Sequence, residues 1–226
     1  FAHASPPTHR SIWTSGGEVW DAGAEPAGEL PTLRTFDAAG IAIARSAPGA
    51  DGTLLVLDNG PNHASHAHMD NLTVHYEALG RPVIVDPGRW IYDRSEDRSW
   101  VYNATSHNRP WIDEPPADGQ GGGPGHWLPE GSGHHLPRIR ELDGTLAGPP
   151  TASERDGLAE LASALHGLNG YRDAGVRRRC WVSLDPDHPW LVVVDELFAH
   201  ADHAWVNSWL LPAAGPADGD AGACTL

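Results

Sequence analysis

The feature that most constrains the fold of this chain is a series of short apolar segments bounded by turn residues. In some segments apolar residues alternate with small or polar residues, and other segments are continuous apolar runs. Both patterns are typical of β-strands. The segments lie at residues 40–45, 53–57, 72–78, 82–85, 111–113, 176–184, 190–197 and 204–211. Many short strands with little helical pattern between them predict an all-β fold, an antiparallel β-sandwich.

Residues 158–168 form a segment whose secondary structure the pattern leaves open. Its apolar residues at 158, 161, 162 and 165 have the spacing of one face of a helix. Eleven residues are too few to distinguish such a helix from a strand. Both alternatives therefore stay open for this segment.

The length of 226 residues is enough for one large all-β domain. Residues 1–36 are rich in Pro, Gly and small polar residues, so we expect a lead-in or linker there and a domain over residues 37–226. A Gly- and Pro-rich stretch at 115–137 predicts a long surface loop. The N-terminus has neither an initiator Met nor a basic-then-apolar signal, so we expect an internal or processed start.

The charge of the chain excludes several classes of partner. The formal net charge is −15, and all fifteen cationic side chains are Arg, which excludes mechanisms that need a Lys. Nucleic acids and anionic membranes bind basic surfaces, so neither is expected as a partner. Residues 81–109 carry five Arg and four acids, a local charge of +1, so an anionic ligand is expected near this segment. No apolar run is long enough for a transmembrane helix, and whether Cys180 pairs with Cys224 stays open.

A cluster of three histidines and an aspartate occupies eight residues: His63, His66, His68 and Asp70. Two apolar segments joined by a turn follow it, and the second ends at Asp86. Imidazole and carboxylate are ligands that zinc and similar divalent metals accept. Imidazole also titrates near neutral pH, which suits proton transfer. The cluster predicts a metal or catalytic site, and the alternative is a solvated polar loop between strands.

The spacing of these residues does not by itself bring the metal ligands together. A straight hairpin places Asp86 opposite Val74, which is six residues from His68, or about 20 Å along an extended strand. The chain must bend back near Asp70 or Asn71 for His68 and Asp86 to share a metal.

Two later groups of polar residues have alternative readings. His107 follows Asn103-Ala-Thr-Ser, and alone it would be interpreted as an ordinary loop histidine. Arg177-Arg178-Arg179 is interpreted as part of a strand with alternate charges pointing outward, and the alternative is a carboxylate-binding role.

Together these residues resemble a known family. The run Asp58-Asn-Gly-Pro-Asn-His-Ala-Ser-His66-Ala-His68-Met-Asp70 and its continuation to Asp86-Pro-Gly88, followed by Tyr92 and Thr105-Ser-His107-Asn108, is similar to the heparinase II/III-like polysaccharide lyases. The Arg178-Arg179 strand and the Val192–Leu197 segment extend the resemblance to about residues 36–211. It implies a β-sandwich that packs against an N-terminal helical toroid, with the active site between them. This chain has no helical region long enough to be that toroid, which would belong to the parent chain or a separate one.

The resemblance also implies roles for individual residues. His68, Asp86 and His107 match ligands of zinc, although another divalent metal would also suit them. His66 matches a histidine that contacts the substrate carboxylate. A tyrosine transfers the proton, and we choose Tyr102 with Tyr92 in reserve. We place Arg89 and Asn108 among the substrate-binding residues.

The implied reaction is β-elimination on an acidic, uronate-containing polysaccharide, by a secreted or periplasmic protein. Because the chain is itself strongly acidic, a uronate polymer such as alginate is favoured over densely sulfated heparin. The main alternative is a non-catalytic, metal-stabilised β-sandwich that binds glycans or a partner chain. A zinc hydrolase with Asp70 as its base is a further alternative.

Overall fold

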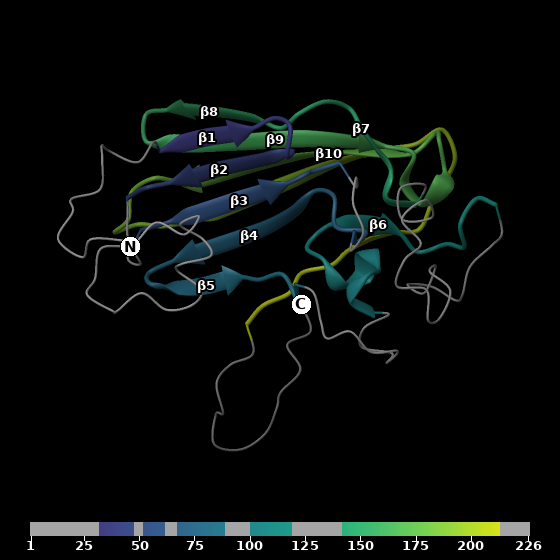
Figure 1. Ribbon diagram of the computed structural model, residues 1–226, viewed down its shortest axis with the longest axis horizontal. Coiled ribbons are helices and arrows are strands. Elements are labelled where there is room, and N and C mark those ends of the chain that lie inside the picture. The colour runs from purple at the N-terminus through teal and green to yellow at the C-terminus, as the bar shows by residue number, and fades with distance from the viewer. Residues whose placement is uncertain (1–31, 48–51, 62–66, 89–99, 119–141, 213–226) are drawn as a thin grey trace, which may run out of the picture.

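The computed structural model describes residues 32–47, 52–61, 67–88, 100–118 and 142–212. Over these residues it contains two five-stranded antiparallel sheets and one two-stranded sheet. Figure 1 shows the two larger sheets stacked face to face, with the purple-to-blue strands of the first in front of the green strands of the second. This arrangement confirms the predicted all-β antiparallel sandwich.

The first sheet is a meander in which each strand pairs with the next along the chain. Its strands are β1 (Leu33–Phe36), β2 (Ile41–Arg45), β3 (Leu54–Asp58), β4 (Thr73–Ala78) and β5 (Arg81–Ile84). Residues 33–36, which we expected at the end of the lead-in, form the edge strand and pair with β2. The hairpin expected between residues 72–78 and 82–85 is present as β4 and β5.

The second sheet has the order β11-β10-β9-β7, with β8 also paired to β9. Its strands are β7 (Thr145–Leu146), β8 (Thr151–Arg155), β9 (Leu158–His166), β10 (Gly175–Ser183) and β11 (Leu191–Phe198). The segment that the sequence left open is the strand β9, because Ala159, Leu161 and Leu165 all point into the core with the period of two of a strand.

A short third sheet and two 3-10 turns lie beside the sandwich. Strand β6 (Pro110–Ile112) pairs with β12 (Trp205–Asn207), and the turns are η1 (Ala104–Ser106) and η2 (Leu168–Gly170). The strand expected over residues 204–211 is therefore shorter than predicted. Beyond residue 207 the backbone hydrogen-bonds to scattered partners instead, including Arg109 O and Val85 N.

The hydrophobic core fills the space between the two larger sheets. Its fully buried side chains are Ala42, Ala44, Leu55, Leu57 and Val74 from the first sheet and Ala159, Leu161, Cys180 and Val182 from the second. Burying one Leu or Val contributes about 1.5–3 kcal/mol, so this layer is the main source of stability. Cys180 is a free thiol whose pKa burial raises to about 12, and Cys224 lies outside the described residues.

A second, smaller cluster packs beneath the segment that carries the predicted site. It consists of Met69, Tyr102, Ala104, Trp111 and Leu142. Figure 1 shows β6 beside the end of the first sheet where β4 begins and β5 ends. In the part of the chain that the structure describes, no helix has the length and apolar character needed to span a bilayer.

Candidate metal centre and active site

The chain bends between His68 and β4, at the position that the hairpin geometry required. The amide of Thr73 donates to the carbonyl of Asp70 at 2.9 Å, which closes a tight turn. Leu72, inside that turn, has a φ of 71°. The hydroxyl of Thr73 then lies 3.4 Å from Asp86 Oδ2. The bend thus places the end of the histidine segment next to Asp86.

His107 and Asp86 are in direct contact at this point. His107 is fully buried, its Nδ1 lies 2.6 Å from Asp86 Oδ2, and its Nε2 lies 3.0 Å from the carbonyl oxygen of Val101. A carbonyl only accepts hydrogen bonds, so Nε2 carries a proton. In a neutral ring Nδ1 is then a lone pair that faces a carboxylate, and two acceptors this close need a cation or a proton between them.

His68 and Tyr102 complete the group. The His68 ring lies 5.5 Å from the His107 ring and 4.7 Å from the Tyr102 ring, between centroids. The amide of Met69 donates to the carbonyl of Tyr102 at 3.0 Å, which ties the two segments together. The structure therefore brings together the three predicted metal ligands and the tyrosine chosen for proton transfer.

The donor set of His68, Asp86 and His107 fits zinc in kind, since two imidazoles and one carboxylate are ligands that zinc takes. A proton between Asp86 and His107 Nδ1 accounts for their 2.6 Å contact, and a metal ion bound by both side chains would take the place of that proton. Within the described ranges, however, no three His, Cys, Asp or Glu side chains are arranged so that they would already hold a metal ion. The assignment of the ligands therefore remains a prediction.

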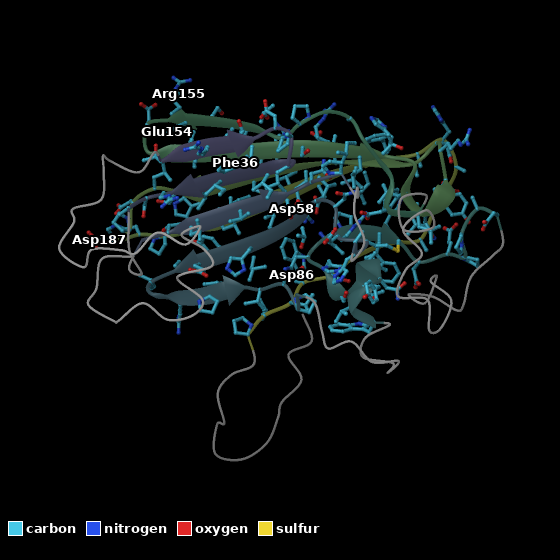
Figure 2. The ribbon with its side chains drawn as sticks, viewed as in Figure 1. Phe36, Asp58, Asp86, Glu154, Arg155 and Asp187 are labelled. Carbon is cyan, nitrogen blue, oxygen red and sulfur yellow. The ribbon has the colours of Figure 1, made fainter. Side chains whose placement is uncertain are left out.

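The carboxylates around His107 have shifted pKa values. Burial alone would raise the pKa of Asp86, but the hydrogen bond and charge of His107, together with the Gly88 amide, outweigh it and lower this pKa. Burial, with the charges of Asp58 and Asp86, raises the pKa of Asp70 to about 6, against the opposing charges of His107 and Arg109. Figure 2 shows Asp58 and Asp86 at the same end of the first sheet. Asp86 is thus the carboxylate most ready to hold a cation at neutral pH.

Asn108 is buried and fully engaged inside the protein. Its side-chain amide donates to the carbonyls of Val74 at 3.0 Å and Val85 at 2.7 Å. Its side-chain oxygen accepts from the Leu210 amide at 2.6 Å. These contacts join β4, the end of β5 and the C-terminal part of the described chain. They favour a framework role for Asn108 over the substrate contact expected from the sequence.

Arg109 has a different role from the one its charge indicated. It is one of the five arginines that predict an anionic ligand near residues 81–109, yet it is fully buried and forms an ion pair with the buried Asp143. It also donates to the carbonyl of Met69 at 3.0 Å, and burial lowers its pKa to about 9. Arg109 therefore anchors the segment next to His68.

Three predicted residues, His66, Arg89 and Tyr92, lie outside the described residues. Their roles remain predictions. The sequence reasoning missed the buried pairs Arg109–Asp143 and Arg178–Asp195. The only signals of these pairs in the sequence are the position of Arg109 directly after His107-Asn108 and the run of three arginines at 177–179.

Comparison with known proteins finds one matching family and several similar solved structures. A family model described as heparinase II/III-like, C-terminal, matches residues 28–226. Among solved structures, a heparinase III described as the BT4657 gene product superposes with a TM-score of 0.57 at 18% identity, covering 92% of this chain and 27% of that one. The heparan sulfate lyase HepC from Pedobacter heparinus superposes with a TM-score of 0.53 at 16% identity, covering 86% and 25%. A search of curated proteins found no match.

Proposed function

Since this chain belongs to the heparinase II/III-like family, to whose C-terminal region it corresponds, we propose that it supplies the metal-binding β-sandwich part of a polysaccharide lyase active site. The observation that carries the proposal is the contact between Asp86 and His107 Nδ1, with His68 and Tyr102 beside it. These side chains come from three separate segments, and the bend at Leu72 is what joins them.

We place a further part of the active site in residues outside this chain. The chain spans 27% and 25% of the two solved lyases compared above. We place an N-terminal helical toroid, in the parent chain or a separate one, across the site from the sandwich. The substrate would lie between the two parts, as the resemblance implies.

The chemistry assigned to the site is β-elimination. The hydrogen on C5 of a uronate becomes acidic only when the charge of the neighbouring carboxylate is offset, and donors placed there stabilise the enolate-like intermediate. We assign this contact to His66, with Arg89 beside it. Tyr102 takes the C5 proton, with Tyr92 in reserve. The electron pair of the C–H bond then forms the C4–C5 double bond as the bond from C4 to O4 breaks, and the leaving oxygen takes up a proton.

Residues of this chain hold the predicted metal ligands in place. A zinc or similar divalent ion bound by His68, Asp86 and His107 would supply a fixed positive charge. His107 is held by the Val101 carbonyl, and the segment of His68 is held by Arg109 and by Tyr102 O. These buried contacts keep the ligands from moving when substrate binds.

The substrate that best suits the charge of the chain is a uronate polymer of low sulfation. The net charge is −15, and the burial of Arg109 removes one of the five arginines that gave residues 81–109 their local charge of +1. A polymeric substrate also implies a secreted or periplasmic location.

The test is turnover by the full-length parent protein on alginate, heparan sulfate and other uronate polymers, followed by the absorbance of the unsaturated uronate product. Wild-type protein should form this product on at least one polymer. His66→Ala should abolish turnover while glycan binding persists, and His188→Ala, which alters an exposed side chain, should leave turnover unchanged. Absence of product from every uronate polymer would refute the lyase.

The second candidate is a non-catalytic glycan-binding module. The observation that favours it is the burial of Tyr102, which is only 6% exposed in this chain. This reading predicts that His66→Ala changes neither glycan binding nor any turnover, because there is no turnover to lose.

A further inference from the structure

Arg178 lies in the middle of β10 and is fully buried between the two sheets. Its neighbours Arg177 and Arg179 point outward and both pair with Glu196 on β11. The expected alternation of the triplet is therefore present, but its middle member is the one that points inward. A buried guanidinium is stable only if a counter-charge and hydrogen-bond acceptors surround it.

Each of the five N–H groups of Arg178 has an acceptor. Nε donates to Asp195 Oδ1 at 2.7 Å, and Nη2 donates to Asp195 Oδ2 at 2.8 Å and to Asn207 Oδ1 at 3.3 Å. Nη1 donates to two backbone carbonyls, that of Leu72 at 2.7 Å and that of Asn108. The fork of donors is used completely, which a lysine in the same place would not achieve.

The two backbone carbonyls belong to the candidate site. Leu72 is the residue at which the chain turns back after His68, and Asn108 directly follows His107. A positive φ at a residue other than glycine is strained, so surrounding contacts must hold it. Arg178, from the opposite sheet, thus reaches both segments that carry the predicted histidine ligands.

We propose that Arg178, oriented by Asp195, is a positioning residue that fixes His107 relative to the bend at Leu72. The second sheet is then part of the site's support, although none of its side chains is a predicted ligand. The reason for this support rests on the proposed function. The position of the His107 ring, however, can be measured without metal or substrate.

The structure offers a matched pair of controls on the same two strands. Arg178–Asp195 is the buried pair, and Arg177–Glu196 is an exposed pair one residue along, with side chains 63% and 42% exposed. Arg178→Lys and Asp195→Asn are therefore compared with Arg177→Lys and Glu196→Gln. Each buried variant keeps the size of the residue while it loosens the hydrogen-bonded fork.

The first measurement is nuclear magnetic resonance of the proton on His107 Nε2 in the ¹⁵N-labelled chain without metal. This proton is buried and donated to Val101 O, so it should exchange slowly enough to observe, and His107→Gln assigns it. Arg178→Lys should shift the signal and speed its exchange at least about tenfold. Arg177→Lys should leave it in place. An unchanged signal in folded Arg178→Lys would overturn the proposal.

The second measurement is zinc affinity, by competition with a chelator. Loss of a partner that orients a metal ligand costs about 10–100-fold in affinity, so Arg178→Lys should bind zinc at least about tenfold more weakly and Arg177→Lys within twofold of wild type. If Arg178→Lys does not fold, Asp195→Asn decides both measurements. Unfolding of both variants would count against the proposal, because Arg178 would then support the whole fold rather than the site. Wild-type protein that binds no zinc, with a His107 signal that still responds to Arg178→Lys, would refute the metal and keep the positioning role.

Discussion

At the scale of single residues, the site depends on the two fixed partners of the His107 ring. The Val101 carbonyl assigns the proton to Nε2, and this leaves Nδ1 to face Asp86. Nothing in the local sequence around His107 indicated these partners, because Val101 and Asp86 reach it through the fold. The family resemblance singled out His107, whereas its surroundings alone suggested an ordinary loop histidine.

The charge of Asp86 gives the first prediction. Asp86→Asn keeps the shape of the side chain and removes the charge that would hold a cation beside His107 Nδ1. We expect zinc content after gel filtration to fall to below about one tenth of the wild-type value, in line with the loss of a metal ligand. Asp185→Asn, at an exposed aspartate, is the control and should retain zinc. Full zinc content in Asp86→Asn would remove Asp86 from the ligand set.

A second prediction concerns Glu114 and His203, away from the site. Burial alone would raise the pKa of Glu114, but hydrogen bonds from His203 at 3.0 Å and from the Ala204 amide at 2.6 Å outweigh it, so this pKa is lowered from 4.5. A lowered carboxyl pKa stabilises the fold above the unfolded value and ceases to do so as the pH falls through the folded one.

The difference in free energy of unfolding between wild type and Glu114→Gln should therefore be largest above about pH 5 and shrink steadily below pH 4.5. Urea unfolding at a series of pH values measures it. Glu154→Gln, at an exposed glutamate that accepts from Thr32, should show a difference near zero throughout. A difference for Glu114→Gln that stays constant with pH would show that its charge is not what matters.

At the scale of elements, the strands were largely predictable because each segment carries its own pattern of apolar residues. Segments such as 40–45 and 53–57 alternate or are continuously apolar, and they form β2 and β3. β9 was not predictable, because its small residues Ala162 and Ala164 on the outer face blur the alternation that Ala159 and Leu161 follow on the inner face. The bend at Leu72 was required by the hairpin geometry, but the Arg178 side chain that binds the Leu72 carbonyl comes from another sheet.

The alternation in β9 gives a third prediction. Leu161 is fully buried in the core and Glu160 lies on the outer face. Leu161→Ala should lower the free energy of unfolding by about 2–5 kcal/mol, because it leaves a cavity between the sheets. Glu160→Ala should change it by less than about 0.5 kcal/mol. Chemical denaturation measures both, and equal effects of the two substitutions would contradict the strand.

At the scale of the whole molecule, the decisive property is the charge. With fifteen arginines against thirty acids, the net charge of −15 repels polyanions at long range. The buried pairs Arg109–Asp143 and Arg178–Asp195 take two arginines and two aspartates away from the surface, so they leave this imbalance unchanged. The fold class followed from the sequence, but the burial of these two ion pairs did not, since burial of a charged residue leaves no mark in composition.

The last prediction follows from this imbalance. A protein that binds a polyanion through a basic surface releases counterions, so its binding is strongest at low salt and falls as salt rises. A strongly acidic chain instead repels a polyanion at long range, and salt weakens this repulsion by screening the charges. We therefore expect that this chain passes through heparin resin without retention at about 10 mM salt, where electrostatic attraction would be greatest. Unsulfated alginate fragments should bind with an affinity that holds steady or improves as salt rises to about 0.15 M. Retention on heparin at low salt with elution by a salt gradient would contradict the preference for a polymer of low sulfation, because it would reveal a basic surface on a chain whose net charge is −15.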